Sequence, residues 1–339
     1  MAENDLESTA KELVAPGKGI WATDASTPTM DKRLTAAGIT PTLETRTMFR
    51  EVLISTPGLG EFISGVILYD ETIRQRISEG IGFVDLLQKQ GIVPGIKVDK
   101  GTVELEGSPE EKVTEGLEGL SERLAEYKQM GAKFAKWRAV IMIGAGIPTL
   151  NCIEANAQRM ASYAKFCQEQ GLVPIVEPEV LMDGEHTIEK SEEITAAALL
   201  SVFAQLKEQK VALEGMILKP NMVLSGYKCQ TQAGLEEVAQ TTIRTLLKAV
   251  PKEVPGIVFL SGGQDALSAT SRLNEIAKIP GLPWKISFSF ERALEGPAME
   301  IWKANPKNVE SAQKSIYKRA KLNSLAVRGL YRKEMENEL

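Results

Sequence analysis

A lysine at the end of an apolar run is the residue best placed to do chemistry in this chain. Lys219 follows the apolar residues 216–218, which lie between Gly215 and Pro220. An apolar run bounded by Gly and Pro is typical of a buried parallel strand. Burial disfavours the ammonium form of a lysine, and a neutral amine can attack a carbonyl carbon. The alternative is that Lys219 forms half of a salt bridge with an acid.

Polar residues also follow most of the other apolar runs. Side chains two apart on a strand share a face, and in parallel barrels the carboxyl ends of all strands meet at one opening. Any one of these residues can be a salt bridge that seals the barrel end. Charged groups at the end of most strands are rarely buried without pairing or function, so their number favours a site. They are Asp24, Lys97, Asp99, Lys136, Arg138, Glu177, Glu179, Lys219, Asn221, Ser261, Ser289 and Arg292.

These residue types suit catalysis through a lysine Schiff base. A second cation, Lys136, disfavours the ammonium form of Lys219 and favours its free amine. Glu177 can supply and remove protons, and Asp24 can balance the lysines or hold a hydroxyl group. A protonated Schiff base withdraws electrons, which lets a neighbouring C–C bond break. This chemistry needs neither a metal nor a histidine, and His186 is the single histidine of the chain.

A second cluster of residues is suited to binding an anion. Ser261, Gly262 and Gly263 follow the seventh apolar run, and such a turn exposes backbone N–H groups. Arg292 follows the eighth run and can add a bidentate contact. A Gly-Gly pair alone is usually only a loop, but the last two strands of such barrels commonly carry a phosphate site.

The elements that must position these residues alternate along the chain. Helical patterns, such as those over 114–130 and 187–210, separate eight short apolar runs, so the sequence predicts an α/β fold, the (β/α)8 TIM barrel. The alternative, a doubly wound open sheet, is disfavoured because no Gly-x-Gly-x-x-Gly or Gly-Lys-Ser/Thr loop follows an early strand. The predicted strands are 19–22, 65–69, 94–98, 134–140, 173–177, 216–219, 256–260 and 284–288.

We expect residues 1–339 to form a single domain. No linker or low-complexity segment divides the chain. Residues before about Gly17 have the pattern of a docking helix, and those after about Asn305 that of a helical C-terminal extension.

Composition argues against several classes of protein. The net charge is −5 and no basic block interleaves with aromatics, which argues against nucleic acid as a partner. No apolar stretch approaches bilayer length and the N-terminus lacks an apolar signal core, so we expect no membrane partner and a cytoplasmic location. Cys152, Cys167 and Cys229 fit reduced packing residues. His186 lies in a polar segment and is expected to be solvated, which leaves zinc sites and histidine triads improbable.

The chain resembles class I (Schiff-base) fructose-1,6-bisphosphate aldolases from about Ala10 to about Arg332. Residues 218–223 read Leu-Lys-Pro-Asn-Met-Val, and residues 259–264 read Phe-Leu-Ser-Gly-Gly-Gln. The other matching segments are 16–20, 64–68, 95–101, 116–123, 134–138, 173–179 and 213–215. The resemblance implies a metal-independent lyase without a cofactor, which forms a covalent Schiff base with its substrate. It implies reversible cleavage of fructose 1,6-bisphosphate to dihydroxyacetone phosphate and glyceraldehyde 3-phosphate, in glycolysis, gluconeogenesis or the Calvin cycle.

The resemblance also implies a role for each site residue. Lys219 matches the Schiff-base lysine, Glu177 the principal acid and base, and Glu179 a supporting carboxylate. Asp24 and Lys136 match residues that assist C–C cleavage and bind substrate hydroxyls. Ser261, Gly262, Gly263, Ser289 and Arg292 match the site of the C1 phosphate, and Lys97, Arg138, Ser26, Lys32 and the nearby Arg33 match positions around the other phosphate. Sedoheptulose bisphosphate is a further expected substrate, and members are commonly homotetramers.

The chain departs from the family pattern at three places. Ala25 stands where the family has Glu, and Pro28 follows in the same segment. Glu291 stands where the family has Gly before the late arginine, which brings an anion near a phosphate unless its side chain points away. The last tyrosine is Tyr331, whereas many members end in a tyrosine that reaches the active site.

Two other readings of the sequence remain open. A non-catalytic scaffold that kept the fold is disfavoured by the presence of Asp24, Lys136, Glu177 and Lys219 together. Another Schiff-base barrel enzyme, of the transaldolase or deoxyribose-phosphate aldolase type, is disfavoured by the two separate groups of phosphate-binding residues.

Overall fold

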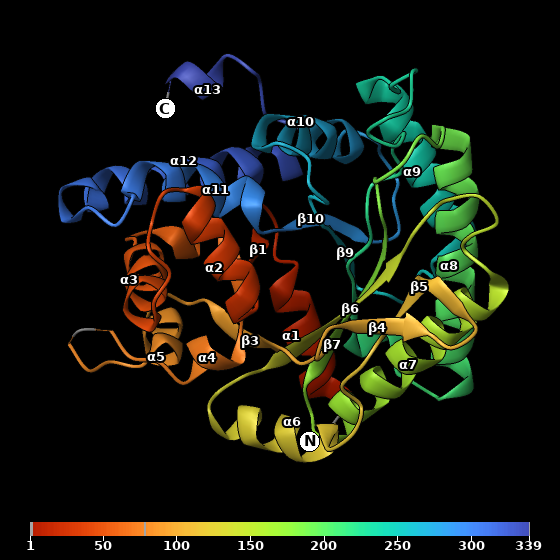
Figure 1. Ribbon diagram of the computed structural model, residues 1–339, viewed down its shortest axis with the longest axis horizontal. Coiled ribbons are helices and arrows are strands. Elements are labelled where there is room, and N and C mark those ends of the chain that lie inside the picture. The colour runs from red at the N-terminus through yellow and green to blue at the C-terminus, as the bar shows by residue number, and fades with distance from the viewer. Residues whose placement is uncertain (1–2, 78, 339) are drawn as a thin grey trace.

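Eight parallel strands close into a barrel in the computed structural model, which describes residues 3–77 and 79–338 (Figure 1). The strand order around the barrel is β1-β10-β9-β8-β7-β6-β3-β2. This confirms the predicted (β/α)8 barrel, and the closed sheet rules out the doubly wound alternative. The barrel strands are β1 (Gly19–Thr23), β2 (Ile63–Leu68), β3 (Val93–Lys97), β6 (Phe134–Ile141), β7 (Val173–Val180), β8 (Ile217–Leu218), β9 (Gly256–Phe259) and β10 (Lys285–Phe290).

Helices surround the barrel on its outer face (Figure 1). Alternate strand residues point inward and outward, so Trp21 packs against the helices while Ile20 faces the barrel interior. The helices are α1 (Glu3–Leu13), α2 (Thr27–Ala36), α3 (Leu43–Ile54), α4 (Asp70–Ile73), α5 (Phe83–Lys89), α6 (Leu120–Gln129), α7 (Leu150–Glu169), α8 (Ile188–Glu208), α9 (Leu235–Ala249), α10 (Ala266–Ala277), α11 (Arg292–Trp302), α12 (Val309–Val327) and α13 (Met335–Glu338). Short 3-10 turns lie at Leu59–Glu61, Leu213–Gly215 and Pro306–Asn308.

Helix α1 docks against the barrel as the sequence predicts. Its buried residues Ala10 and Leu13 belong to one apolar cluster with Ile20, Phe134 and Val173 from the barrel. Gly19, Val93 and Val173 begin their strands, so α1 covers the amino-terminal end of the barrel. The carboxyl ends of the strands are left free to carry a site.

The helical C-terminal extension is also confirmed. Helix α12 packs beside α10, α11 and α3 on the outside of the barrel. Tyr331, which follows α12, is buried, and its hydroxyl donates to Glu336 Oε1 at 3.0 Å.

One predicted helix is partly wrong. Residues 114–130 were predicted to be helical, but Thr114 ends strand β5 (Ser108–Thr114), which pairs with β4 (Thr102–Leu105) in an antiparallel hairpin. Only α6 forms in the later part of this range. Both strands are short and largely polar on their exposed side, so they lack the apolar run that marks a barrel strand.

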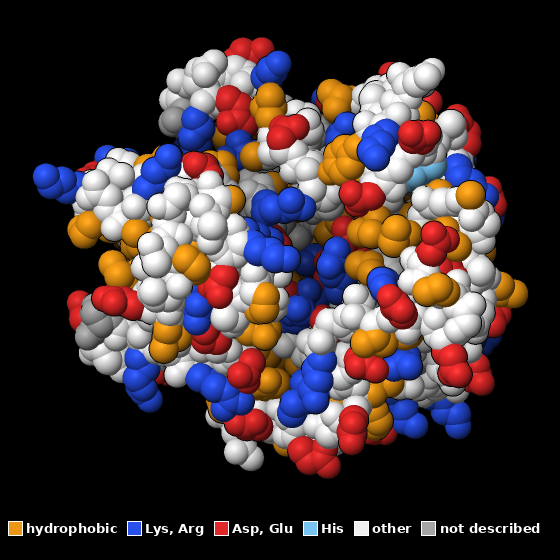
Figure 2. All heavy atoms as spheres, in the orientation of Figure 1, with side chains coloured by type: hydrophobic (Ala, Val, Ile, Leu, Met, Phe, Trp, Pro, Cys, Tyr) orange, Lys and Arg blue, Asp and Glu red, His pale blue; other side chains and the backbone are white. Residues whose placement is uncertain are grey.

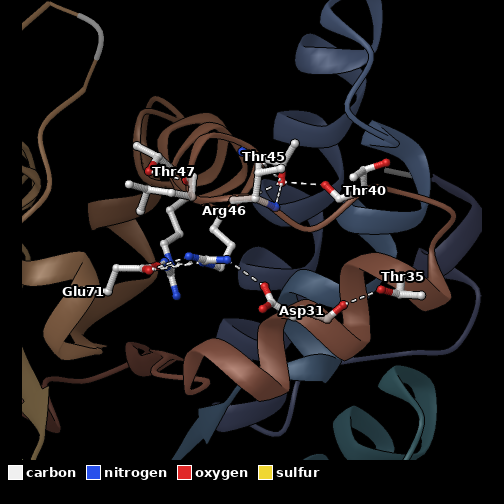
Figure 3. A network of polar contacts seen from close by, with 10 residues as sticks. Asp31, Thr35, Thr40, Thr45, Arg46, Thr47 and Glu71 are labelled. Atoms are coloured by element: carbon white, nitrogen blue, oxygen red, sulfur yellow. Dashed lines mark hydrogen bonds and ion pairs between the residues drawn. The ribbon is translucent and has the colours of Figure 1, made fainter.

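A network of charged residues joins helices α2, α3 and α4 to one another (Figure 3). Arg46 on α3 donates from Nη1 to Asp31 on α2 at 2.8 Å, and from Nη2 to Glu71 on α4 at 2.8 Å. Arg50, one turn later on α3, donates to Glu71 Oε1 at 2.6 Å. The network fixes α2, whose first turn lies at the opening of the barrel.

Glu71→Gln is expected to lower the free energy of unfolding by roughly 3 kcal/mol. The Arg50 side chain is fully buried, and its Nε and Nη2 find no hydrogen-bond partner in the described part of the chain, so the variant leaves a buried charge unpaired. Burial alone would raise the pKa of Glu71, but Arg46 and Arg50 lower it below its usual 4.5. The stabilisation is therefore present above about pH 4.5 and is lost as the pH falls through the lowered value.

Urea unfolding followed by circular dichroism measures this change. Glu44→Gln, an exposed glutamate in the first turn of α3, is the control and should cost under about 0.5 kcal/mol. A Glu71→Gln effect as small as the control's would contradict the buried-charge account.

Candidate active site

A cavity of about 570 Å³ opens at the carboxyl ends of the barrel strands. Figure 2 shows lysine and arginine side chains gathered in a hollow at the centre of that face. The structure brings together most of the predicted site residues, although they span the chain from its first strand to its last. Those that line the cavity are Asp24, Ser26, Arg33, Lys97, Lys136, Arg138, Glu177, Glu179, Lys219, Ser261, Gly262, Ser289 and Arg292.

Three predicted residues do not line the cavity. Asn221 is buried, and its Oδ1 accepts from the Val180 N–H at 2.9 Å. Lys32 is exposed on α2, whereas its neighbour Arg33 lines the cavity. Consecutive helical residues point about 100° apart, so the two side chains cannot both face the opening. Gly263 lies behind the lining and continues the turn that Ser261 and Gly262 begin.

Four buried groups form a chain of alternating charge on the floor of the cavity. Lys219 Nζ lies 3.1 Å from Glu177 Oε1, and Lys136 Nζ lies 3.1 Å from Glu177 Oε2. Asp24 Oδ2 lies 2.6 Å from the same Lys136 Nζ. All four residues are buried. Glu177 therefore bridges the two lysines, and Lys219 is a salt-bridge partner as well as the candidate nucleophile.

Strand register explains why these groups meet. Lys136 on β6 pairs with Ile175 on β7, and Arg138 pairs with Glu177, so the polar ends of the two strands are level. Strand β8 ends at Leu218, but the Lys219 N–H still donates to Val176 O at 2.9 Å. Lys219 is thereby held beside Glu177 on the neighbouring strand.

Burial and charge fix the protonation of three of these groups. Burial alone would raise the pKa of Asp24, but Lys136, Lys219 and Lys97 hold it well below its usual range. Burial would also raise the pKa of Glu177, yet Lys136 and Lys219 lower it. For Lys136, burial would lower the pKa, but Asp24 and Glu177 raise it well above its usual value. At neutral pH the site thus holds two carboxylates and a permanent ammonium, and Glu177 is free to accept a proton.

One end of the cavity carries cations that are each paired with an acid. Arg138 Nε donates to Glu179 Oε2, and Lys97 Nζ lies 3.5 Å from Asp99 Oδ1. Glu179 is buried, as expected for a supporting carboxylate, but among the described residues it forms its ion pair with Arg138 and not with Lys219. Lys97 and Arg138 come from β3 and β6, which are neighbours in the barrel.

The other end of the cavity is the turn after β9. Gly262 and Gly263 have φ of +53° and +83°, a conformation that favours glycine. A Cβ atom at Gly263 would lie 3.2 Å from Arg292 Nη2, which places that guanidinium directly against the turn. Ser289 Oγ is buried and finds no hydrogen-bond partner among the described residues. These donors meet at the corner between the last two strands, where the sequence predicts an anion site.

Sequence reasoning missed a tyrosine at this corner. Tyr227, from the segment between β8 and α9, donates its hydroxyl to Gly262 O at 3.0 Å. The bond ties the turn to a separate segment and leaves the backbone N–H side free. Tyr227 follows no apolar run, so the strand-end pattern held no signal for it.

The structure accounts for the places where the chain departs from the expected pattern. Pro28 stands in the first turn of α2, where proline fits, and Thr29 beside it lines the cavity. Glu291 has φ of −113°, which any residue adopts, and its side chain turns to Arg33 at 2.8 Å. Tyr331 is buried outside the cavity lining, where its N–H donates to Asn274.

His186 differs from the expectation of a solvated loop residue. It is half-buried, and neither ring nitrogen finds a hydrogen-bond partner in the described chain. Burial lowers its pKa, so the ring is neutral at pH 7. Within residues 3–77 and 79–338, His, Cys, Asp and Glu form no group of three or more with the arrangement of a metal site. In that same part of the chain, no helix has the length and apolar character needed to cross a membrane.

Comparisons with known proteins show the family to which this chain belongs. The family described as "Fructose-bisphosphate aldolase class-I" matches residues 5–339. A relative from Xanthomonas campestris pv. campestris, named "Probable fructose-bisphosphate aldolase class 1", is 53% identical over 98% of this chain and 100% of its own. "Fructose-bisphosphate aldolase" from Dictyostelium discoideum is 48% identical over 97% of this chain and 93% of its own.

A solved structure gives the same result for the fold. It is a fructose-bisphosphate aldolase from Plasmodium falciparum in complex with TRAP and a small-molecule inhibitor, with a TM-score of 0.96 and 46% identity. The alignment covers 97% of this chain and 95% of that one. The chain therefore belongs to the class I fructose-bisphosphate aldolases, lyases that cleave fructose 1,6-bisphosphate through a lysine Schiff base and without a metal.

Proposed function

We propose that Lys219 is the lysine that forms the Schiff base in this aldolase. The observation that carries the proposal is the 3.1 Å contact between Lys219 Nζ and Glu177 Oε1 on the cavity floor. A lysine amine there has a carboxylate beside it that can take its proton before attack and return one afterwards. Borohydride reduction with dihydroxyacetone phosphate, followed by peptide mapping, tests the assignment: the triose phosphate should be found on Lys219.

The proposed reaction begins at the ketone of the open-chain sugar. The Lys219 amine attacks C2, and Glu177 transfers protons as the carbinolamine forms and loses water. The resulting iminium accepts the electron pair of the C3–C4 bond when the C4 hydroxyl gives up its proton. Glyceraldehyde 3-phosphate leaves, and the remaining enamine is protonated at C3 and hydrolysed to dihydroxyacetone phosphate and free Lys219.

Asp24 and Lys136 are proposed to act on the hydroxyl groups near the breaking bond. Lys136 carries a fixed positive charge, and it can stabilise an alkoxide as the C4 proton is lost. Asp24 holds Lys136 in place through the 2.6 Å ion pair and has oxygens that can accept from a hydroxyl. Glu179 is proposed to position Arg138 through their ion pair.

The two polar ends of the cavity are proposed to hold the two phosphates. Ser261, Gly262, Gly263, Ser289 and Arg292 surround the corner for the C1 phosphate. Lys97 and Arg138, with Ser26 at the start of α2, lie where the C6 phosphate would bind.

Lys97→Met is expected to lower kcat/KM for fructose 1,6-bisphosphate roughly 10- to 100-fold, because it removes the stabilisation of the substrate by one charge-assisted hydrogen bond. Fructose 1-phosphate lacks the second phosphate, so its kcat/KM should change less than about threefold. Steady-state kinetics with both sugars measures the difference, and Lys89→Met, at an exposed lysine ending α5, is the control. Equal losses for both sugars, or equal wild-type kcat/KM values, would contradict a C6 phosphate site at Lys97.

We also propose that residues 1–339 form one domain, that the chain assembles as a homotetramer and that it works in the cytoplasm. Helices α1 and α12 both pack on the barrel, which supports a single unit. The three free cysteines suit a reducing compartment. A relative from Arabidopsis thaliana is named "Fructose-bisphosphate aldolase 3, chloroplastic", so location needs its own test. A single calorimetric transition, light scattering and cell fractionation test the three proposals in turn.

A further inference from the structure

The Arg33 guanidinium is shared by two carboxylates of helix α11. Its Nη1 donates to Glu291 Oε1 at 2.8 Å and to Glu295 Oε1 at 3.2 Å. Arg33 lies on α2 and lines the active-site cavity, as does Glu291. These three residues are called the Arg33 cluster below. Burial alone would lower the pKa of Arg33, but Glu291 and Glu295 outweigh it and raise the pKa.

The two carboxylates of the cluster differ in their freedom to move. Glu295 has a side chain only 1% exposed, and its Oε2 accepts from Trp21 Nε1 at 3.2 Å. Glu291 is 26% exposed and lies on the cavity wall. Its carboxylate does not cap α11. Glu295 is therefore a fixed partner of Arg33. The side chain of Glu291, in contrast, has Arg33 as its one polar partner among the described residues.

We propose that Glu291 is a built-in competitor of the substrate phosphate for Arg33. In the empty site its carboxylate occupies an anion position on the guanidinium, and a bound phosphate takes that position over. The inference rests on the proposed phosphate corner at Arg292, the residue next to Glu291. It places Arg33 at that corner, and not at the other phosphate to which the resemblance assigns it, and it adds a residue that sets the phosphate affinity of the corner.

The physical basis is that carboxylate and phosphate use the same guanidinium donors. A phosphate beside Arg33 would meet the Glu291 carboxylate on the same cation, and like charges this close repel. Burial and Glu291 raise the pKa of Glu295 to about 7, so its charge is partly lost at neutral pH. Glu295 is held by burial and by Trp21, so Glu291 is the group that swings away. A phosphate ester carries about −1.5 to −2 charges at pH 7 and displaces a carboxylate of charge −1. The competition weakens the binding of every anion at Arg33 by the same factor, so only an anion that binds tightly, such as a phosphate ester, occupies the position.

The test measures binding without catalysis. A hexitol 1,6-bisphosphate has an alcohol at C2 and forms no Schiff base, so its Kd by calorimetry is independent of Lys219 chemistry. Glu291→Gln and Glu291→Ala should both tighten this ligand and inorganic phosphate on the order of five- to tenfold, the scale of one partly exposed ion pair. Acetate binding, measured the same way, should tighten by about the same factor, since the competitor raises the apparent Kd of every anion at Arg33 equally. Glu300→Gln, at an exposed position of the same helix, should leave all three Kd values unchanged.

A second background shows whether the effect passes through Arg33. When Arg33 is already replaced by Met, adding Glu291→Gln should change the Kd of the hexitol bisphosphate and of phosphate less than twofold. The guanidinium for which Glu291 and phosphate compete is then absent. Unchanged or weaker phosphate binding in the Glu291 variants would overturn the proposal, and so would tightening that persists in Arg33→Met. Unaltered thermal unfolding of each variant shows that the comparison is between folded proteins. Failure to trap triose phosphate on Lys219 would overturn the proposed function and leave these Kd values to decide the role of Glu291.

Discussion

Lys219→Met is expected to lower kcat for fructose 1,6-bisphosphate by a factor on the order of 10⁴ or more, the scale seen when a covalent nucleophile is lost. Methionine matches the length of the lysine stem but has no amine, so no carbinolamine can form. The same variant should take up no triose phosphate when borohydride is added with dihydroxyacetone phosphate. Both losses follow from one missing atom, because the other site groups keep their positions on different strands.

A matched control separates chemistry from folding. Lys285→Met removes an exposed lysine at the start of β10 and should leave both cleavage and trapping unchanged. Coupled-enzyme kinetics measures cleavage, and mass spectrometry of the reduced protein measures trapping. Normal cleavage by Lys219→Met would refute the assignment of the nucleophile. Loss of cleavage with trapping retained would instead place the Schiff base on another lysine.

Glu177→Gln is expected to lower kcat by about 10²- to 10⁴-fold, which is the rate enhancement that a general acid and base usually provides. Glutamine keeps the shape of the side chain but cannot take a proton from Lys219 or return one to the leaving water. The substitution also removes the anion that stands 3.1 Å from both lysine amines. Lys136 then keeps Asp24 at 2.6 Å, whereas Lys219 loses its carboxylate partner at 3.1 Å, so the free energy of unfolding should fall as well.

The rate of borohydride trapping distinguishes a catalytic role of Glu177 from a purely structural one. Schiff-base formation should be slowed in Glu177→Gln, so borohydride trapping should reach the same end point as in wild type but over a longer time. Glu193→Gln, at an exposed glutamate of α8, is the control and should leave the trapping rate unchanged. A Glu177→Gln variant that keeps more than a tenth of the wild-type kcat would contradict its role as the principal acid and base.

The sequence allowed the barrel to be predicted because each of its strands is an apolar run bounded by a turn. The ends of the strands were predicted less exactly than their positions. Strand β7 continues to Val180 beyond the predicted end at residue 177, whereas β8 is only Ile217–Leu218 and is shorter than the predicted 216–219. These ends depend on ladder hydrogen bonds to a neighbouring strand, which no local pattern reports. The β4–β5 hairpin was missed for a related reason, since its stability comes from pairing and not from an apolar core.

The site residues could be predicted from their positions at strand ends, but their partners could not. Glu177 between two lysines, and Glu179 on Arg138, follow from register between β6 and β7. Lys32 and Arg33 are adjacent in sequence, and only the rotation of α2 decides which faces the cavity. Glu295 gave no signal because it lies inside helix α11, beyond the polar residues that directly follow β10.

The chain of alternating charge has a consequence for how this protein folds. Asp24, Lys136, Glu177 and Lys219 lie on or directly after four different strands, and the barrel closes only when β1 pairs with both β10 and β2. Contacts between residues so distant in the chain form slowly, because the intervening loops must first be ordered. Lys219 and Glu177 can meet once the neighbouring strands β7 and β8 pair, but Asp24 reaches Lys136 across the barrel only when β1 is in place. The full row of charges is therefore assembled only once the barrel has closed, so the return of activity during refolding reports that closure.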